Sequence, residues 1–175
     1  MACNSALTAR DIRACFREYY QYRFNEVGLF EFEISGVNYP KEPCRFDIFM
    51  IVPHRQIMKG FEIKVNRSDF LADQKIRPNK FYWGQEAGGG EAKWKAYIKY
   101  CNLFCFVCPE GLIKAEEIEA PAGLIWIVGI PPRFIFQMKK RPRRTMPTGG
   151  MDPALQRRIL FLFAARAKTR EGSYF

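Results

Sequence analysis

Two strand-like runs separated by four residues constrain the fold of this 175-residue chain most strongly. Residues 46–52 (FDIFMIV) and 57–65 (IMKGFEIKV) are rich in apolar and β-branched residues, which favour strands, and PHRQ (53–56) between them predicts a short turn. If these four residues form the loop, Val52 faces Ile57 and the two runs form an antiparallel hairpin with a defined register.

This register places charged side chains opposite each other on one face of the hairpin. Asp47 lies directly across from Glu62, and Lys64 shares the face of Glu62 because strand residues two apart point the same way. Carboxylates opposed at about 5 Å are destabilising unless a cation neutralises them. Mg²⁺ or Mn²⁺ would do so, since both prefer oxygen ligands, and either can activate water and hold a phosphate. An ordinary hairpin with Glu62 paired to Lys64 or Arg45 on a solvated face is the alternative.

The rest of the chain predicts a single domain of the α/β class, with a mixed β-sheet flanked by helices. No internal repeat and no second domain are evident. Three consecutive glycines predict flexibility for residues 81–92. Helices are expected at 8–24 with Thr8 as N-cap, at 66–76 with Asn66 or Ser68 as cap, at 93–100 and at 153–168, and further strands at 29–36, 102–108 and 124–130.

The excess positive charge is confined to the last quarter of the chain. Eleven of the 28 Lys and Arg residues lie between Arg133 and Arg170, where only Asp152 opposes them, and the remainder holds 17 basic and 17 acidic residues. Such a block favours a polyanionic partner, most commonly nucleic acid, although a solubilising tail is the alternative. We interpret 133–170 as a basic linker followed by a C-terminal helix. The expected phosphate contacts, with little sequence selectivity, are Lys139, Lys140, Arg141, Arg143, Arg144, Arg157 and Arg158.

The arrangement of R-x-D at 45–47 and F-E-I-K at 61–64 resembles the D…(D/E)-x-K signature of PD-(D/E)XK nucleases. Further blocks resemble, in order, the bacterial MmcB-like DNA-repair family within that superfamily, and together they extend from about Glu31 to Ala167. These blocks are RFDIFMIV, EIKVNRSDFLADQK, W-x-x-Y-x-x-Y-C with FCFVCPEGLI, GLIWI, and PALQRRILFLFAARA.

The resemblance implies a restriction-endonuclease-like fold and cleavage of DNA phosphodiester bonds with Mg²⁺ or Mn²⁺, in DNA repair or processing, together with repair-protein partners. Asp47 and Glu62 would be metal ligands, joined by the backbone carbonyl of Ile63, and Lys64 would be the catalytic lysine. A further acid upstream often completes such sites, and the candidates are Glu33, Glu31 and Glu18. A DNA-binding adaptor that keeps the fold without catalysis is the alternative function.

An insertion at about 76–93 departs from the family pattern. It contains Phe81, Tyr82 and Trp83 next to Lys80, and aromatic side chains there would stack on exposed bases at about 1–3 kcal/mol each. The alternative is that these rings only anchor the loop to the core.

Asp69 and Asp73, four residues apart on the helix that precedes the insertion, could complete a second metal site. We favour instead a role at the helix N-terminus or a solvated position.

The cysteines suggest a remote alternative function. Cys101, Cys105 and Cys108 have the spacing of a radical-SAM iron–sulfur motif, but they lie on a predicted buried strand, where Cys105 and Cys108 face opposite sides. Buried thiols are therefore expected. Six cysteines without a recognisable secretion signal favour a reducing, cytoplasmic compartment. No apolar run approaches the roughly 18 residues of a membrane span, so no membrane association is expected.

Overall fold

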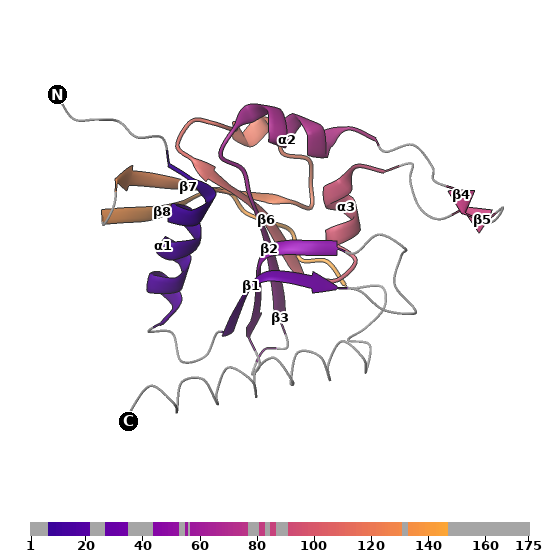
Figure 1. The fold of residues 1–175 in the computed structure, drawn as a ribbon, viewed down its shortest axis with the longest axis horizontal. Helices are drawn as coiled ribbons and strands as arrows, with labels where there is room; N and C mark the ends of the chain where they lie inside the picture. The colour runs from indigo at the N-terminus through magenta and orange to yellow at the C-terminus, as the bar shows by residue number, and fades with distance from the viewer. Residues whose placement is uncertain are drawn as a thin grey trace.

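The computed structural model describes residues 7–21, 27–34, 44–52, 55, 57–76, 81–82, 85–86, 91–130 and 133–146 (Figure 1). Their main feature is a six-stranded sheet with the order β1-β2-β3-β6-β7-β8. Its strands are β1 (Val27–Ile34), β2 (Cys44–Val52), β3 (Ile57–Ile63), β6 (Leu103–Pro109), β7 (Gly123–Ile130) and β8 (Arg133–Lys140). The helices are α1 (Ala9–Gln21), α2 (Arg67–Gln74), α3 (Lys93–Tyr97) and the 3-10 turn η2 (Ala115–Glu117).

Parallel and antiparallel pairs are combined in this sheet. β1 with β2, β2 with β3 and β7 with β8 are antiparallel, whereas β3 with β6 and β6 with β7 are parallel. Parallel neighbours need a crossover connection, and the segment with α2 and α3 provides it between β3 and β6. The predicted mixed α/β architecture is therefore confirmed.

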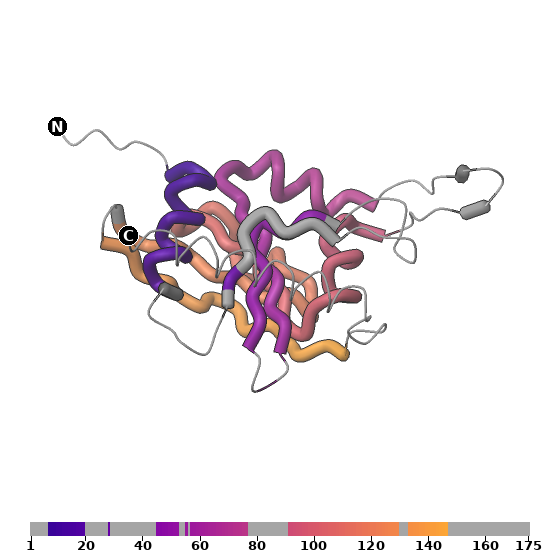
Figure 2. The backbone as a smooth tube through the Cα atoms, turned by 60° about the horizontal axis from the view of Figure 1, so that its bottom comes forward, coloured from indigo at the N-terminus to yellow at the C-terminus, as the bar shows by residue number. Residues whose placement is uncertain are grey.

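The predicted register of the β2–β3 hairpin is also confirmed. Val52 lies opposite Ile57, and the pairing continues to Ile48 opposite Phe61. Figure 2 shows the two strands running side by side toward their turn. The paired ladder stops one pair short of Asp47 and Glu62, while β3 stays paired with β6. The strands β2 and β3 therefore begin to separate where the charged residues lie.

Helices cover both faces of the sheet, so neither face of the hairpin is solvated. On one face, Ile12 and Phe16 of α1 pack in a cluster with Ile48 and Phe61. On the other face, the core contains Phe70 of α2, Trp94 and Tyr97 of α3, and Phe49, Phe104 and Phe106 of the sheet. The face of the hairpin that carries Glu62 and Lys64 is therefore covered by α2 and α3 and belongs to the core.

The helix starts agree with their sequence signals. The Thr8 backbone N–H donates to Asp11 Oδ2 at 2.9 Å, and the Asp11 N–H donates back to Thr8 Oγ1 at 3.2 Å. This reciprocal cap fixes the start of α1 and confirms Thr8 as its N-cap. The Asn66 side chain accepts from the Asp69 N–H at 2.8 Å, which confirms Asn66 as the cap of α2.

The strand β8 corrects the prediction of a linker from residue 133 onward. Residues 133–140 pair with β7, and their side chains alternate as a strand requires. The Phe136 ring lies 4.8 Å, between ring centroids, from both Phe16 and Tyr19 of α1, so this strand extends the core under that helix. Its basic residues led to the prediction of a linker, although its apolar residues alternate with the period of two that is typical of a strand. The predicted C-terminal helix at 153–168 lies outside the described residues.

The insertion starts and ends at adjoining points of the fold. Ile76 and Ala92 form an isolated antiparallel bridge, which closes its base. Within it, β4 (Phe81–Tyr82) pairs with β5 (Gln85–Glu86), so four residues of the segment predicted to be flexible form regular structure. The glycines at 88–90 lie outside the described residues.

No helix in the described part of the chain is both long and apolar enough to span a membrane.

Candidate active site

Glu62 and Lys64 form a buried ion pair at the end of β3. Lys64 Nζ lies 3.1 Å from Glu62 Oε1, and both side chains are less than a tenth exposed. Their shared face follows from the strand period, as predicted. The alternative of an ion pair on a solvated face does not hold, because α2 and α3 enclose the pair. A charged pair taken out of water needs further compensation, so its surroundings decide what it can do.

Asp73 of α2 supplies part of that compensation. Its Oδ2 lies 2.5 Å from Lys64 Nζ, and Asp73 is buried. The prediction of a solvated or helix-capping Asp73 is wrong, whereas Asp69 does lie at the start of α2 beside its cap. The signal was present in the sequence, because Asp73 follows Phe70 by three residues and residues so spaced share a helix face.

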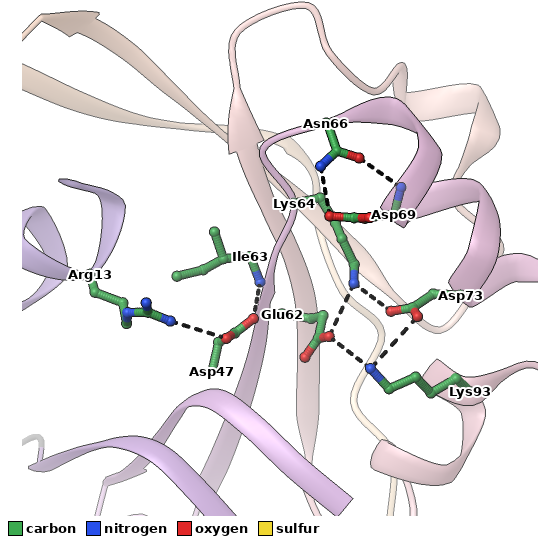
Figure 3. Close-up of polar contacts among 9 residues, drawn as sticks. All are labelled: Arg13, Asp47, Glu62, Ile63, Lys64, Asn66, Asp69, Asp73 and Lys93. Atoms are coloured by element: carbon green, nitrogen blue, oxygen red, sulfur yellow. Dashed lines mark hydrogen bonds and ion pairs between the residues drawn. The ribbon is translucent and has the colours of Figure 1, made fainter. Parts of the chain in front are cut away.

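Lys93, the first residue of α3, reaches the same two acids. Its Nζ lies 3.3 Å from Glu62 Oε1 and 3.6 Å from Asp73 Oδ1. The four side chains thus form a closed ring of alternating charge, with Lys64 and Lys93 each between Glu62 and Asp73 (Figure 3). Lys93 was not among the predicted site residues, because it is 31 residues from Glu62, beyond the insertion, and no local periodicity connects the two.

Asp47 lies on the other side of the β3 backbone from this ring, so the prediction that it shares one face of the hairpin with Glu62 is wrong (Figure 3). Its Oδ2 accepts a hydrogen bond from the Ile63 N–H at 2.8 Å, and its Oδ1 lies 3.4 Å from Arg13 Nη1 of α1. The Asp47 side chain therefore accepts a hydrogen bond from the β3 backbone at the point where β2 and β3 separate. Ile63, the expected carbonyl ligand, is in this way fixed against the Asp47 carboxylate.

An irregularity in β2 sets the position of Asp47. Strand alternation would put Phe46 on the face of Ile48, but Phe46 packs instead with Phe49 and Tyr97, at ring-centroid distances of 5.1 and 4.9 Å. Gly60 makes room for this ring, since a Cβ on Gly60 would lie 2.5 Å from Phe46 Cε1. Side-chain alternation is thus broken next to the candidate catalytic acid.

The electrostatics of the site centre on Glu62. Burial raises the pKa of Glu62 above its ordinary value; the negative charges of Asp47 and Asp73 act in the same direction, and the cations of Lys64 and Lys93 oppose them. Glu62 Oε2 is buried and makes no hydrogen bond to any described residue. The carboxylates of Asp47, Glu62 and Asp73 and the cations Arg13, Lys64 and Lys93 sum to a formal charge of zero.

The donor chemistry of the site fits Mg²⁺ or Mn²⁺ at Glu62 and Asp47. A buried carboxylate oxygen that makes no hydrogen bond to a described residue is the kind of ligand that these ions prefer. Asp47 would supply a second carboxylate, whose oxygens here contact the Ile63 N–H and Arg13. In the described part of the chain, no three His, Cys, Asp or Glu side chains form a group that would hold a metal ion by themselves. A divalent cation would also make the neutral cluster positive, so it would bind best together with an anionic phosphate and water.

Of the three upstream acids, Glu18 alone has a side chain that the structure describes. Glu18 is exposed on α1. Glu33 lies on β1 opposite Arg45 in the backbone register, and the side chains of Glu33 and Glu31 are outside the described part of the structure. The choice among them stays a prediction.

The predicted phosphate contacts divide into two kinds. Lys140 Nζ donates to the carbonyls of Ala115 and Ile118, which makes it an anchor for η2. Lys139 Nζ lies 4.3 Å from the centroid of the Trp126 ring. The exposed basic residues that follow β8 are Arg141, Arg143 and Arg144, whereas Arg157 and Arg158 lie outside the described residues.

The segment 141–146 lies near the opposite end of β3 from Glu62. The Thr145 N–H donates to the Asn102 carbonyl at 2.8 Å, and the Asn102 N–H donates to the Met58 carbonyl, also at 2.8 Å. Met58 is four strand residues from Glu62, a separation of about 13 Å. The exposed arginines of this segment therefore lie at a distance from the ring around Glu62.

The cysteines of β6 face opposite sides of the sheet, as predicted. Cys105 belongs to the core under α1, whereas Cys101 and Cys108 belong to the core under α2 and α3. Burial raises the pKa of both Cys105 and Cys108 to about 12, so these thiols stay protonated. The three sulfurs do not converge as ligands of one iron–sulfur cluster must.

Comparisons with known proteins identify no relative. No family model matches the chain, and no curated protein or solved structure does so. The class of protein is therefore defined by the fold and the site alone. It is a mixed α/β domain with a buried ring of two acids and two lysines, close to the Asp47 carboxylate where β2 and β3 separate.

The side chains of Phe81 and Tyr82, and all of Trp83, lie outside the described residues, so the base-stacking prediction stays a prediction.

Proposed function

We propose that this chain is a metal-dependent nuclease that hydrolyses DNA phosphodiester bonds with Mg²⁺ or Mn²⁺. The observation that carries the proposal is the buried Glu62–Lys64 pair close to Asp47, where β2 and β3 separate. One oxygen of Glu62 makes no hydrogen bond to any residue that the structure describes. Sequence resemblance to MmcB-like PD-(D/E)XK nucleases supports the same assignment. The mixed sheet with helices on both faces is compatible with their restriction-endonuclease-like fold.

Asp47, Glu62 and the Ile63 carbonyl would hold the metal. When bound, such an ion supplies an activated water and positive charge at the phosphate. Arg13 and the Ile63 N–H hold the Asp47 carboxylate in place. Glu62 must lose its proton to act as a ligand, and the cations of Lys64 and Lys93 favour that ionised form against the cost of burial.

Lys64 would orient the attacking water and stabilise charge that develops on the phosphate. Its ammonium is fixed by Glu62 on β3 and Asp73 on α2, so its direction is set before substrate binds. Preorganised charge of this kind contributes to catalysis because it does not have to reorient during the reaction.

The basic residues after β8 would hold the DNA backbone. Arg141, Arg143 and Arg144 are exposed and belong to the part of the chain that carries the whole excess charge. Phosphate contacts of this kind give affinity with little sequence selectivity. A role in DNA repair or processing, in the cytoplasm and with repair-protein partners, completes the proposal.

Cleavage of labelled single-stranded and duplex DNA tests the proposal. The wild type is compared in Mn²⁺ and in EDTA with Lys64→Met, which removes the charge but keeps much of the volume, and with Lys59→Met as the matched control on the same strand. We expect metal-dependent cleavage that falls at least about a hundredfold in Lys64→Met and is kept in Lys59→Met. Salt-sensitive binding without cleavage on any of these substrates would favour the adaptor, and the absence of both would overturn the proposal.

A further inference from the structure

The two lysines of the buried ring differ in their exposure to solvent. The Lys64 side chain is 7% exposed and lies between two carboxylates, whereas the Lys93 side chain is 31% exposed and contacts the same two acids. An anion that approaches the site from solvent therefore reaches the Lys93 side chain before that of Lys64.

From this difference we infer that Lys93 binds a phosphate of the nucleic acid at the active site, an inference that rests on the proposed nuclease function. Lys64 then acts on the attacking water and the phosphate that is cleaved, and Lys93 adds a phosphate contact from the more exposed side of the ring. Because the Lys93 side chain is 31% exposed, a phosphate oxygen can approach it while its ion pairs to Glu62 and Asp73 remain.

The fold holds Lys93 at this place. Trp94 and Tyr97 bury one side of α3, and Lys93 Nζ lies 5.6 Å from the centroid of the Tyr97 ring. The residue before it, Ala92, is bridged to Ile76 at the base of the insertion. The position of the amine is thus set by packing on both sides, as a substrate-binding group requires.

Lys95 provides a matched control on the same helix. Its side chain is 34% exposed, and its Nζ lies 3.0 Å from Glu119 Oε1 and 5.5 Å from the centroid of the Trp94 ring. Substitution of either lysine removes one positive charge from α3, but only Lys93 belongs to the ring around Glu62.

Binding of a labelled 20-base-pair duplex in EDTA, measured by anisotropy from about 50 to 300 mM salt, tests the inference without cleavage. In Lys93→Gln we expect the slope of log K against log salt to become shallower by about 0.9, the value for one phosphate contact, and in Lys95→Gln to stay unchanged. Lys93→Arg should restore the slope. Equal slopes in wild type and Lys93→Gln, or equal losses in both glutamine variants, would overturn the inference.

Lysine acetylation of the wild type gives a second measurement that does not depend on how a variant folds. Bound duplex should protect Lys93 from the reagent several-fold and leave Lys95 reactive. Equal labelling of Lys93 with and without DNA would overturn the inference.

The results that would overturn the nuclease function differ from those that would overturn the Lys93 contact. Protection of Lys93 by a wild-type protein that never cleaves DNA would overturn the nuclease alone, and metal-dependent cleavage with an unprotected Lys93 would overturn the contact alone.

Discussion

The ammonium of Lys64 lies 2.5 Å from a carboxylate oxygen of Asp73, and both side chains are buried where α2 covers the end of β3. This contact joins the candidate catalytic strand to the helix that follows it. It also fixes the direction of the lysine, because Glu62 holds the same amine from the strand itself at 3.1 Å. The site is therefore part of the core, and we expect changes in it to affect stability.

Asp73→Asn should destabilise the protein by about 3 kcal/mol or more, because loss of one partner leaves a buried charge less well compensated. Asp69→Asn, on the exposed start of the same helix, should cost about 1 kcal/mol or less. Urea unfolding of both variants measures the difference. Equal small losses would mean that Asp73 is not part of a buried ion pair.

Glu62→Gln should change how stability depends on pH. Burial raises the pKa of Glu62 in the folded state above its ordinary value of 4.5, so ionised Glu62 favours the unfolded chain. Its contribution to stability is fully present below pH 4.5 and is lost as the pH rises through the folded-state pKa. The free energy of unfolding of wild type, relative to Glu62→Gln, should therefore fall with rising pH in urea titrations between pH 4 and 8. A relative gain would contradict the raised pKa.

Lys140→Met should lower the stability of the protein, whereas Arg144→Met should weaken the salt dependence of DNA binding. Lys140 donates to two carbonyls of the η2 region, so its loss should cost about 1–2 kcal/mol of stability and leave the salt slope of DNA binding unchanged. Arg144 is exposed, so its loss should leave stability unchanged and reduce the slope by about 0.9. Urea unfolding and salt titrations of both variants separate the two roles. A reduced salt slope in Lys140→Met would show instead that Lys140 contacts a DNA phosphate, as the sequence predicted.

Cys105 and Cys108 should resist alkylation in the native protein. Both are buried, and burial raises the pKa of each to about 12, so neither the thiolate nor the access needed for reaction is present. Iodoacetamide at pH 8 followed by peptide mass spectrometry should find both unmodified until denaturant is added. Rapid labelling without denaturant would show that β6 is less protected than its packing implies.

Local sequence rules predicted the hairpin and the helix starts well. The register from Val52 opposite Ile57 follows from turn length and a period of two, and the caps at Thr8 and Asn66 follow from hydrogen bonds between near neighbours. The strand β8 was missed because charge and proline at its borders outweighed the alternation of Phe134 and Phe136. Each of these features depends on residues close together in the chain.

The amino-acid sequence by itself determined that Glu62 and Lys64 share one face of a strand near Asp47, since backbone geometry enforces the period of two. Tertiary structure alone decided that this face is buried, that Asp73 and Lys93 complete a ring of charge, and that Asp47 turns toward Ile63 and Arg13. The reason is that these contacts join separate elements across the chain. Their geometry depends on how α1, α2 and α3 pack on the sheet, which no local pattern encodes.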